Sequence, residues 1–144
     1  MYKRILVPTD GSEITVKAIQ AAISMAKLMG AEVFALAVKE PFPYSAISEM
    51  QPVPPQEFLD AQERVAAARV KAVGEAAAEA GVACQGHSVE GLHPWEAILD
   101  HGKAQNCDLI VMASHGRRGM SALLLGSETQ KVLTHSTVPV LVVR

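Results

Sequence analysis

The sequence predicts an α/β fold: a doubly wound, five-stranded parallel sheet with helices on both faces. Short β-branched apolar runs alternate along the chain with longer segments of helical periodicity. That alternation is typical of parallel sheets whose crossover helices cover both faces. The 144 residues, 49% of them apolar, are enough for one compact domain with a substantial core. Because no shift in composition marks a boundary, residues 1–144 are expected to form a single domain.

The first part of the chain carries two strands and one helix. The apolar run at positions 5–7, followed by turn residues, predicts a buried strand over Lys3–Pro8. Helical spacing of apolar side chains predicts a helix over Ser12–Met29, with Ser12 as its N-cap and Gly30 just beyond its end. Val33–Val38 is apolar at every position, which predicts a strand buried on both faces.

The middle of the chain begins with a long irregular segment. Prolines exclude a regular element across most of Lys39–Gln56. Connections of this length are typically functional lids, interface loops or disordered segments. An alanine-rich helix is predicted over Glu57–Ala80, and Gly81 ends it. A weaker strand follows at Val82–Val89, and Pro94 suits the first turn of a short third helix.

The last part of the chain completes the alternation. Leu109–Ala113 is the predicted fourth strand, and Ser114–Gly119 is the loop that follows it. A final helix is predicted over Ser127–His135, with its first serine and Gln130 forming a capping box. Pro139–Val143 is the predicted fifth strand.

Composition excludes several classes of partner and location. Thirteen basic residues against fifteen acidic ones, a net charge of −2, leave no electrostatic footprint for nucleic acid or an anionic membrane. The apolar runs are far shorter than the roughly 18 residues of a spanning helix. The run after Lys3 and Arg4 is too short for a secretory signal. The two cysteines, Cys84 and Cys107, cannot make a disulfide framework and are expected to be buried thiols. We therefore expect a cytoplasmic protein with no nucleic-acid or membrane partner.

Catalytic and metal-binding patterns are missing from the sequence. It contains neither a P-loop nor G-x-G-x-x-G after the first strand, and no G-x-S-x-G nucleophile elbow. The five histidines include no i, i+4 pair and stand near no cysteine cluster, which argues against a zinc site. A phospho-receiver domain would need an acidic cluster after the first strand, where Asp10 stands by itself. No catalytic residue and no metal ligand is predicted.

Ligand-type residues follow two of the predicted strands. Thr9–Ser12 comes after the first strand, and the segment 113–127 comes after the fourth. In open parallel sheets, ligands bind beyond the carboxyl ends of the strands, where the strand order reverses. If both segments contact one ligand, strands one and four must be neighbours. This assumption favours the order 3-2-1-4-5 over the flavodoxin-like order 2-1-3-4-5.

The segment after the fourth strand has the features of a phosphate site. Gly116 and Gly119 permit positive φ and a close approach to a ligand, and successive N–H groups can form an anion-binding nest. Gly126 and Ser127 open a helix whose free N–H groups suit a phosphate. Each feature by itself is better explained by an ordinary turn or cap. Their combination at one sheet edge favours phosphate.

Four charged or titratable residues complete the candidate site. The Asp10 carboxylate stands just past a strand end, where it could accept hydrogen bonds from ribose hydroxyls, although Asp-Gly is also an ordinary turn pair. Arg117 and Arg118 could reach phosphate oxygens or remain solvated. His115 either points into the site or orders the loop.

Four segments spread over the whole chain carry a family resemblance. They are Ile5–Ser12, the tripeptide at 114–116, the tetrapeptide at 124–127, and Val138–Val143. They resemble the universal stress protein family, whose ATP-binding branch has the motif G-x2-G-x9-G-[S/T]. The nine-residue spacing is kept here between Gly116 and Gly126, but the first motif glycine is replaced by Ala113.

The resemblance implies the same strand order, 3-2-1-4-5, and an adenine-nucleotide site. Asp10 would contact the ribose, and the backbone of Val38 would face the adenine. The implied ligand is ATP or AMP, with or without Mg²⁺, acting as a regulatory switch in stress response, with ATP hydrolysis slow at most. The candidate cofactor-binding residues are Pro8, Thr9, Asp10, Val38, Ala113, His115, Gly116, Arg117, Arg118, Gly119, Gly126, Ser127 and Glu128.

Family members often form dimers through their last strands, and the uncharged run Val138–Val143 suits such a homodimer. The alternative function is a nucleotide-free dimer that acts as an interaction module, which Ala113 in place of glycine favours. Lys39–Gln56 would then bind a partner, whereas in the nucleotide-binding interpretation it forms a lid. Redox chemistry through the two cysteines is a third alternative, and it requires exposed thiols.

Overall fold

Parallel strands form the centre of the molecule, in the order β3-β2-β1-β4-β5. The computed structural model describes residues 1–43, 53–117 and 124–144. The strands are β1 (Arg4–Pro8), β2 (Glu32–Lys39), β3 (Cys84–Glu90), β4 (Leu109–Ala113) and β5 (Val140–Val143). Each neighbouring pair is parallel, so the predicted sheet and its order are confirmed.

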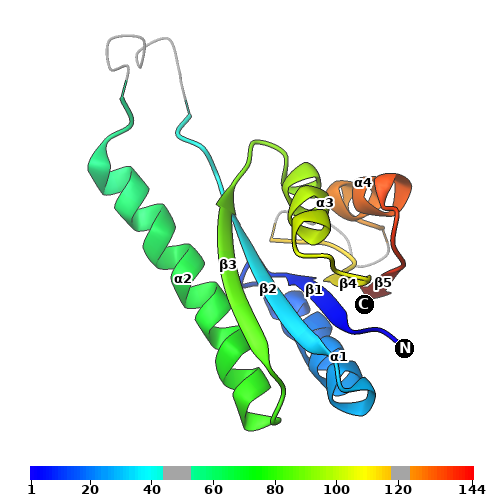
Figure 1. Cartoon of the computed structure of the whole chain (residues 1–144). Coiled ribbons are helices and arrows are strands. Elements are labelled where there is room, and N and C mark those ends of the chain that lie inside the picture. The colour runs from blue at the N-terminus through cyan, green and yellow to red at the C-terminus, as the bar shows by residue number, and fades with distance from the viewer. Residues whose placement is uncertain (44–52, 118–123) are drawn as a thin grey trace.

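Helices cover both faces of the sheet, as predicted (Figure 1). They are α1 (Glu13–Met29), α2 (Gln56–Glu79), α3 (Pro94–Ala104) and α4 (Ser127–His135). Side chains alternate along β1: Ile5 and Val7 pack with α1 and α2, whereas Leu6 packs in the opposite core with α3 and α4. The two cores hold the carboxyl ends of β1 and β4 side by side.

Both ends of α1 lie where the sequence predicted, but only the C-terminal end is capped in the predicted way. Gly30 has φ 65° and donates its N–H to the Ala26 carbonyl, which confirms the left-handed C-terminal cap. Ser12 occupies the N-cap position, but its hydroxyl lies 2.7 Å from Thr15 Oγ1 and bonds no N–H of the first turn. The hydroxyl therefore belongs to a side-chain network rather than to a helix cap.

The predicted capping box of α4 is wrong. The N-cap is Gly126, and Ser127 is already the first helical residue. Gln130 uses its side-chain amide to bond the Leu125 carbonyl at 2.8 Å. The start of α4 is fixed instead by the end of β4, because Thr129 Oγ1 donates to the Ala113 carbonyl at 3.0 Å. The start of α4 is therefore held by a tertiary hydrogen bond rather than by a side-chain cap.

Strands β3 and β5 both begin later than the sequence predicted, because of hydrogen bonding at their first residues. Val82 donates its N–H to the Ala77 carbonyl at 2.8 Å, which closes the end of α2 and delays β3 until Cys84. Pro139 has no N–H to donate, and β5 starts at Val140. The centre of the proline-bearing connection, residues 44–52, lies outside the described residues, so its role as a lid or partner surface stays a prediction.

In the ranges that the structure describes, no helix has both the length and the apolar content required to cross a membrane.

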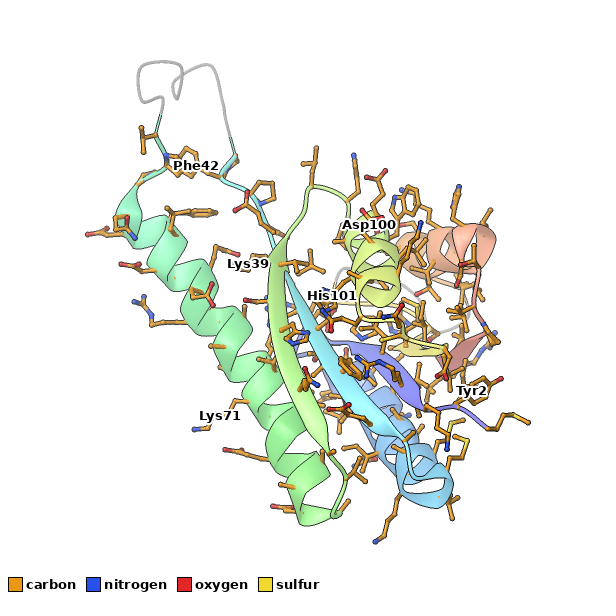
Figure 2. The ribbon with its side chains drawn as sticks, viewed as in Figure 1. Tyr2, Lys39, Phe42, Lys71, Asp100 and His101 are labelled. Carbon is orange, nitrogen blue, oxygen red and sulfur yellow. The ribbon has the colours of Figure 1, made fainter. Side chains whose placement is uncertain are left out.

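A histidine pair joins α3 to the edge strand β3. His87 Nδ1 and His101 Nε2 lie 2.8 Å apart, and their rings meet edge to face. His101 lies between α3 and the strands (Figure 2). Burial lowers the pKa of His101 below its ordinary value, and the neighbouring charge of His87 lowers it further. His101 therefore favours its uncharged form in the folded protein.

Acidification should weaken the fold through this pair. Because the pKa of His101 is lower in the folded chain than in the unfolded chain, the stabilisation is present above about pH 6.5 and is lost as the pH falls through the folded pKa. Urea unfolding of the wild type at pH 7.5 and 5.5 should show this loss, and H101Q should reduce it. H93Q, at an exposed histidine, is the matched control. Equal losses in H101Q and the wild type would contradict the assignment.

Candidate functional site

Asp10 joins the two segments that were predicted to share a ligand. It follows β1, and its Oδ1 accepts hydrogen bonds from Ser12 N at 2.9 Å and Thr15 Oγ1 at 2.8 Å. Its Oδ2 accepts the N–H of Arg117, in the segment after β4, at 2.7 Å. Since β1 and β4 are adjacent, the β1–α1 turn and the β4–α4 segment meet at one edge of the sheet. That edge is where the strand order reverses.

Hydrogen bonding keeps the half-buried Asp10 carboxylate charged. Burial raises the pKa of Asp10, but hydrogen bonds from the Ser12 side chain and backbone, Thr15 and Arg117 outweigh it and lower the pKa below its usual value. The carboxylate is therefore an anion at neutral pH that can accept further donors.

Gly116 is required by a close approach rather than by a special backbone conformation. A Cβ at this position would lie 2.6 Å from Asp10 Oδ2. Positive φ among the described glycines occurs at 11, 30 and 81. Of the two uses that the sequence suggested for Gly116, positive φ and a close approach, the structure shows the close approach. The missing side chain lets the β4–α4 segment contact the Asp10 carboxylate directly. Arg118 and Gly119, which were also predicted for the site, lie outside the described residues.

Gly126 makes the second close approach, at the start of α4. It donates its N–H to the Ser114 carbonyl at 2.8 Å. A Cβ on Gly126 would lie 3.0 Å from His115 Cα. The Ser114 hydroxyl, in turn, lies 3.2 Å from His115 Nδ1. His115 therefore contacts its neighbour within the β4–α4 segment, and the choice between the two roles that the sequence left open stays a prediction.

Glu128, in the first turn of α4, contacts the neighbouring helix. Its Oε2 accepts the backbone N–H of Trp95, at the start of α3, at 2.8 Å. Trp95 also stacks on His135 at the other end of α4, with ring centroids 4.5 Å apart. The start of α4 is thus tied to both β4 and α3, which fixes the direction of its N–H groups.

The remaining predicted residues lie at the same sheet edge. Pro8 ends β1, and the buried Thr9 donates its N–H to the Leu36 carbonyl at 2.8 Å. Val38 stands near the end of β2, half-buried and packed on the α3 side of the sheet. Ala113 ends β4, with its side chain in the core on the α1 side. Asp10 directly contacts the backbone of residues 116–117. Val38 lies at the same edge of the sheet, near the end of β2.

Arg69 of α2 belongs to this neighbourhood and was not predicted from the sequence. Its Nε lies 3.2 Å from the position that a Cβ on Gly11 would take, and Gly11 has φ +78°. The helical periodicity of the sequence did hold a signal for Arg69. It comes three residues after the buried Ala66, which places it on the inward face of α2. Lys71, by contrast, points away from the molecule (Figure 2).

Other reactive groups take no part in the site. In the part of the chain that the structure describes, no three His, Cys, Asp or Glu side chains gather where they could hold a metal ion. Cys107 is buried and Cys84 is half-buried, so only one thiol matches the expectation of burial fully. Burial raises the pKa of Cys107 to about 11 and also raises that of Cys84. Both thiols are therefore poor nucleophiles at neutral pH.

Comparison with known proteins identifies the family. A sequence profile of the universal stress protein family matches residues 1–144. Universal stress protein YxiE of Bacillus subtilis is 34% identical over 149 residues, covering 100% of both chains. The solved structure of universal stress protein UspA from Lactobacillus plantarum has a TM-score of 0.85 at 27% identity, covering 99% of this chain and 98% of that one. A universal stress protein solved in complex with cAMP has a TM-score of 0.73 at 26% identity, covering 99% and 97%. The chain belongs to the universal stress protein family.

Replacing Gly116 with alanine should destabilise the protein through Asp10. The new methyl group would overlap Oδ2, and such overpacking typically costs about 1–3 kcal/mol of unfolding free energy. In an Asp10→Ala background the overlap disappears, so the same substitution should cost less. Gly74→Ala, within α2 and open on all sides, is the control and should stabilise slightly. Urea unfolding measures all of these variants. An equal cost of G116A in both backgrounds would contradict the contact.

Proposed function

We propose that this chain binds an adenine nucleotide at the edge between β1 and β4 and acts as a regulatory switch in the stress response. The observation that carries the proposal is the ionised Asp10, which the β1–α1 turn and the β4–α4 segment both contact. Oδ2 accepts the Arg117 N–H, and a carboxylate oxygen has room for a second donor such as a ribose hydroxyl.

The start of α4 supports phosphate binding at the same edge. No side chain caps the helix, and the lack of a side chain at Gly126 brings its first turn against Ser114 and His115. Uncapped N–H groups and the positive end of the helix dipole favour a phosphate. In the proposal, Ser127 and Glu128 contribute backbone N–H groups, and Val38 contacts the adenine. Mg²⁺, when it accompanies ATP, would be held mainly by the phosphates and water.

The structure shows the backbone and the packing of Ala113, the alanine that replaces the first glycine of the motif. Among the described residues other than glycine, positive φ occurs at Asn106, so Ala113 has an ordinary backbone. Its methyl group packs in the core with α1. The substitution therefore supplies little reason to prefer the nucleotide-free interaction module. The relative solved in complex with cAMP supports an adenine ligand for this chain.

The same proposal places the protein in the cytoplasm, where free thiols such as Cys84 and Cys107 are usual. It gives the nucleotide a regulatory role, with hydrolysis slow at most, because the sequence motifs include no general base.

Nucleotide should raise the unfolding temperature. At about a hundred times its dissociation constant, a ligand stabilises the native state by about 2.7 kcal/mol, which shifts a domain of this size by several degrees. ATP, ADP and AMP should each be measured with and without Mg²⁺. Asp10→Ala should abolish the shift, whereas Asp100→Asn, at an exposed carboxylate on α3, should retain it. Gly126 is less suitable as a test, because a side chain there would also displace Ser114 and His115. No shift with any nucleotide at millimolar concentration would refute the proposal.

We further propose a homodimer formed through β5. This strand is paired with β4 on one side, lies at the end of the sheet order, and has Leu141 39% exposed. An uncharged edge of this kind needs a partner to cover it.

A lysine on this edge should dissociate the dimer. The wild type should sediment at twice the chain mass of 15.3 kDa, and Leu141→Lys at the mass of one chain. Leu28→Lys, on the exposed surface of α1, serves as the matched control and should remain dimeric. A wild type that sediments as a single chain would exclude the dimer, and an unaffected L141K would exclude this edge.

A further inference from the structure

Two imidazole nitrogens from separate elements meet on the α3 side of the sheet, outside the residues of the candidate nucleotide site. His87 Nδ1, on the edge strand β3, lies 2.8 Å from His101 Nε2, on α3. Both residues are half-buried and therefore partly open to water. The sequence holds no i, i+4 pair of histidines, so it is the fold that brings these two ligand-type side chains together.

The surroundings of the pair leave His101 in the form that a metal ion binds. Burial and the neighbouring His87 lower the pKa of His101, so its ring is neutral at pH 7. A neutral imidazole offers a nitrogen lone pair, which an imidazolium lacks. The cationic Arg4 lies over the Phe34 ring, with its guanidinium carbon 4.3 Å from the ring centroid. Its charge is paired with Glu32 at 3.9 Å.

The spacing of the two nitrogens fits one coordination geometry better than another. Metal–nitrogen bonds to histidine are about 2.0–2.1 Å long, so two such nitrogens lie about 2.8–3.0 Å apart at a right angle and about 3.3–3.4 Å apart at a tetrahedral angle. The observed 2.8 Å matches the right angle. Right-angled coordination by nitrogen is typical of Cu²⁺ and Ni²⁺, whereas Zn²⁺ sites are tetrahedral.

We propose that His87 and His101 together bind a divalent transition-metal ion of right-angled geometry, Ni²⁺ or Cu²⁺. In the hydrogen-bonded pair, one of the two facing nitrogens carries a proton. Binding needs both lone pairs, so that proton moves to the second nitrogen of its own ring, and both rings turn toward the ion and stay neutral. Within the described residues no third His, Cys, Asp or Glu joins the pair, so water fills the other positions. This site does not depend on the proposed function.

Calorimetric titration with NiCl₂ at pH 7.5 tests the site in wild type, H87Q, H101Q and H93Q. Wild type should bind one Ni²⁺ per chain. Losing an outer-shell partner of a metal site typically costs about 10–100-fold in affinity, so losing a ligand in H87Q or H101Q should cost at least about tenfold. H93Q removes an exposed histidine and should match the wild type. ZnCl₂ should bind more weakly than NiCl₂, because a tetrahedral ion requires the two nitrogens to separate.

Four results would overturn the inference. They are no Ni²⁺ binding by wild type at millimolar concentration, a loss in only one of the two variants H87Q and H101Q, an equal loss in H93Q, and tighter binding of Zn²⁺ than of Ni²⁺. Circular dichroism checks that each variant is folded. If H101Q does not fold, wild type answers the same question by nuclear magnetic resonance. Paramagnetic Ni²⁺ should then broaden the ring signals of His87 and His101 before that of His93, and the reverse order would refute the site.

Discussion

The hydrogen bonds of one half-buried carboxylate hold the candidate site of this protein together. Removing the Asp10 anion from water is costly unless donors surround it. The chain supplies those donors from the first turn of α1 and from the backbone after β4. Two local features follow from that arrangement. Gly116 has no side chain because the carboxylate occupies its space, and the turn after Asp10 takes a left-handed residue, Gly11.

The fold could be predicted from the sequence because its signals are local and agree with one another. Uninterrupted apolar runs identify β2 and β4, and Gly30 identifies the end of α1 through its freedom to adopt positive φ. The strand order needed more than periodicity. It followed from the assumption that the residues after β1 and β4 meet, and the contact between Asp10 and Arg117 shows that they do.

The errors arise where distant contacts decide the local structure. Ser127 matches a capping box, but the N-cap is Gly126, and a side chain of the first turn, Thr129, is bonded to the end of β4 instead. Gly116 was expected to permit positive φ or a close approach to a ligand, and a single sequence cannot reveal that a carboxylate 106 positions away excludes its side chain. Arg69 was missed because helical periodicity indicates which face of α2 is inward but not which loop that face meets. Nucleotide binding by the candidate residues stays a prediction.

The contacts of Trp95 have a practical consequence. It is the only tryptophan in the sequence. Its backbone is bonded to Glu128 in the first turn of α4, and its ring lies against His135 at the far end of that helix. Trp95 therefore contacts α4 near both of its ends, with its backbone at the first turn and its ring at the last. The protein thus carries a single indole fluorophore, in contact with α4, whose emission reports on that helix without any added label.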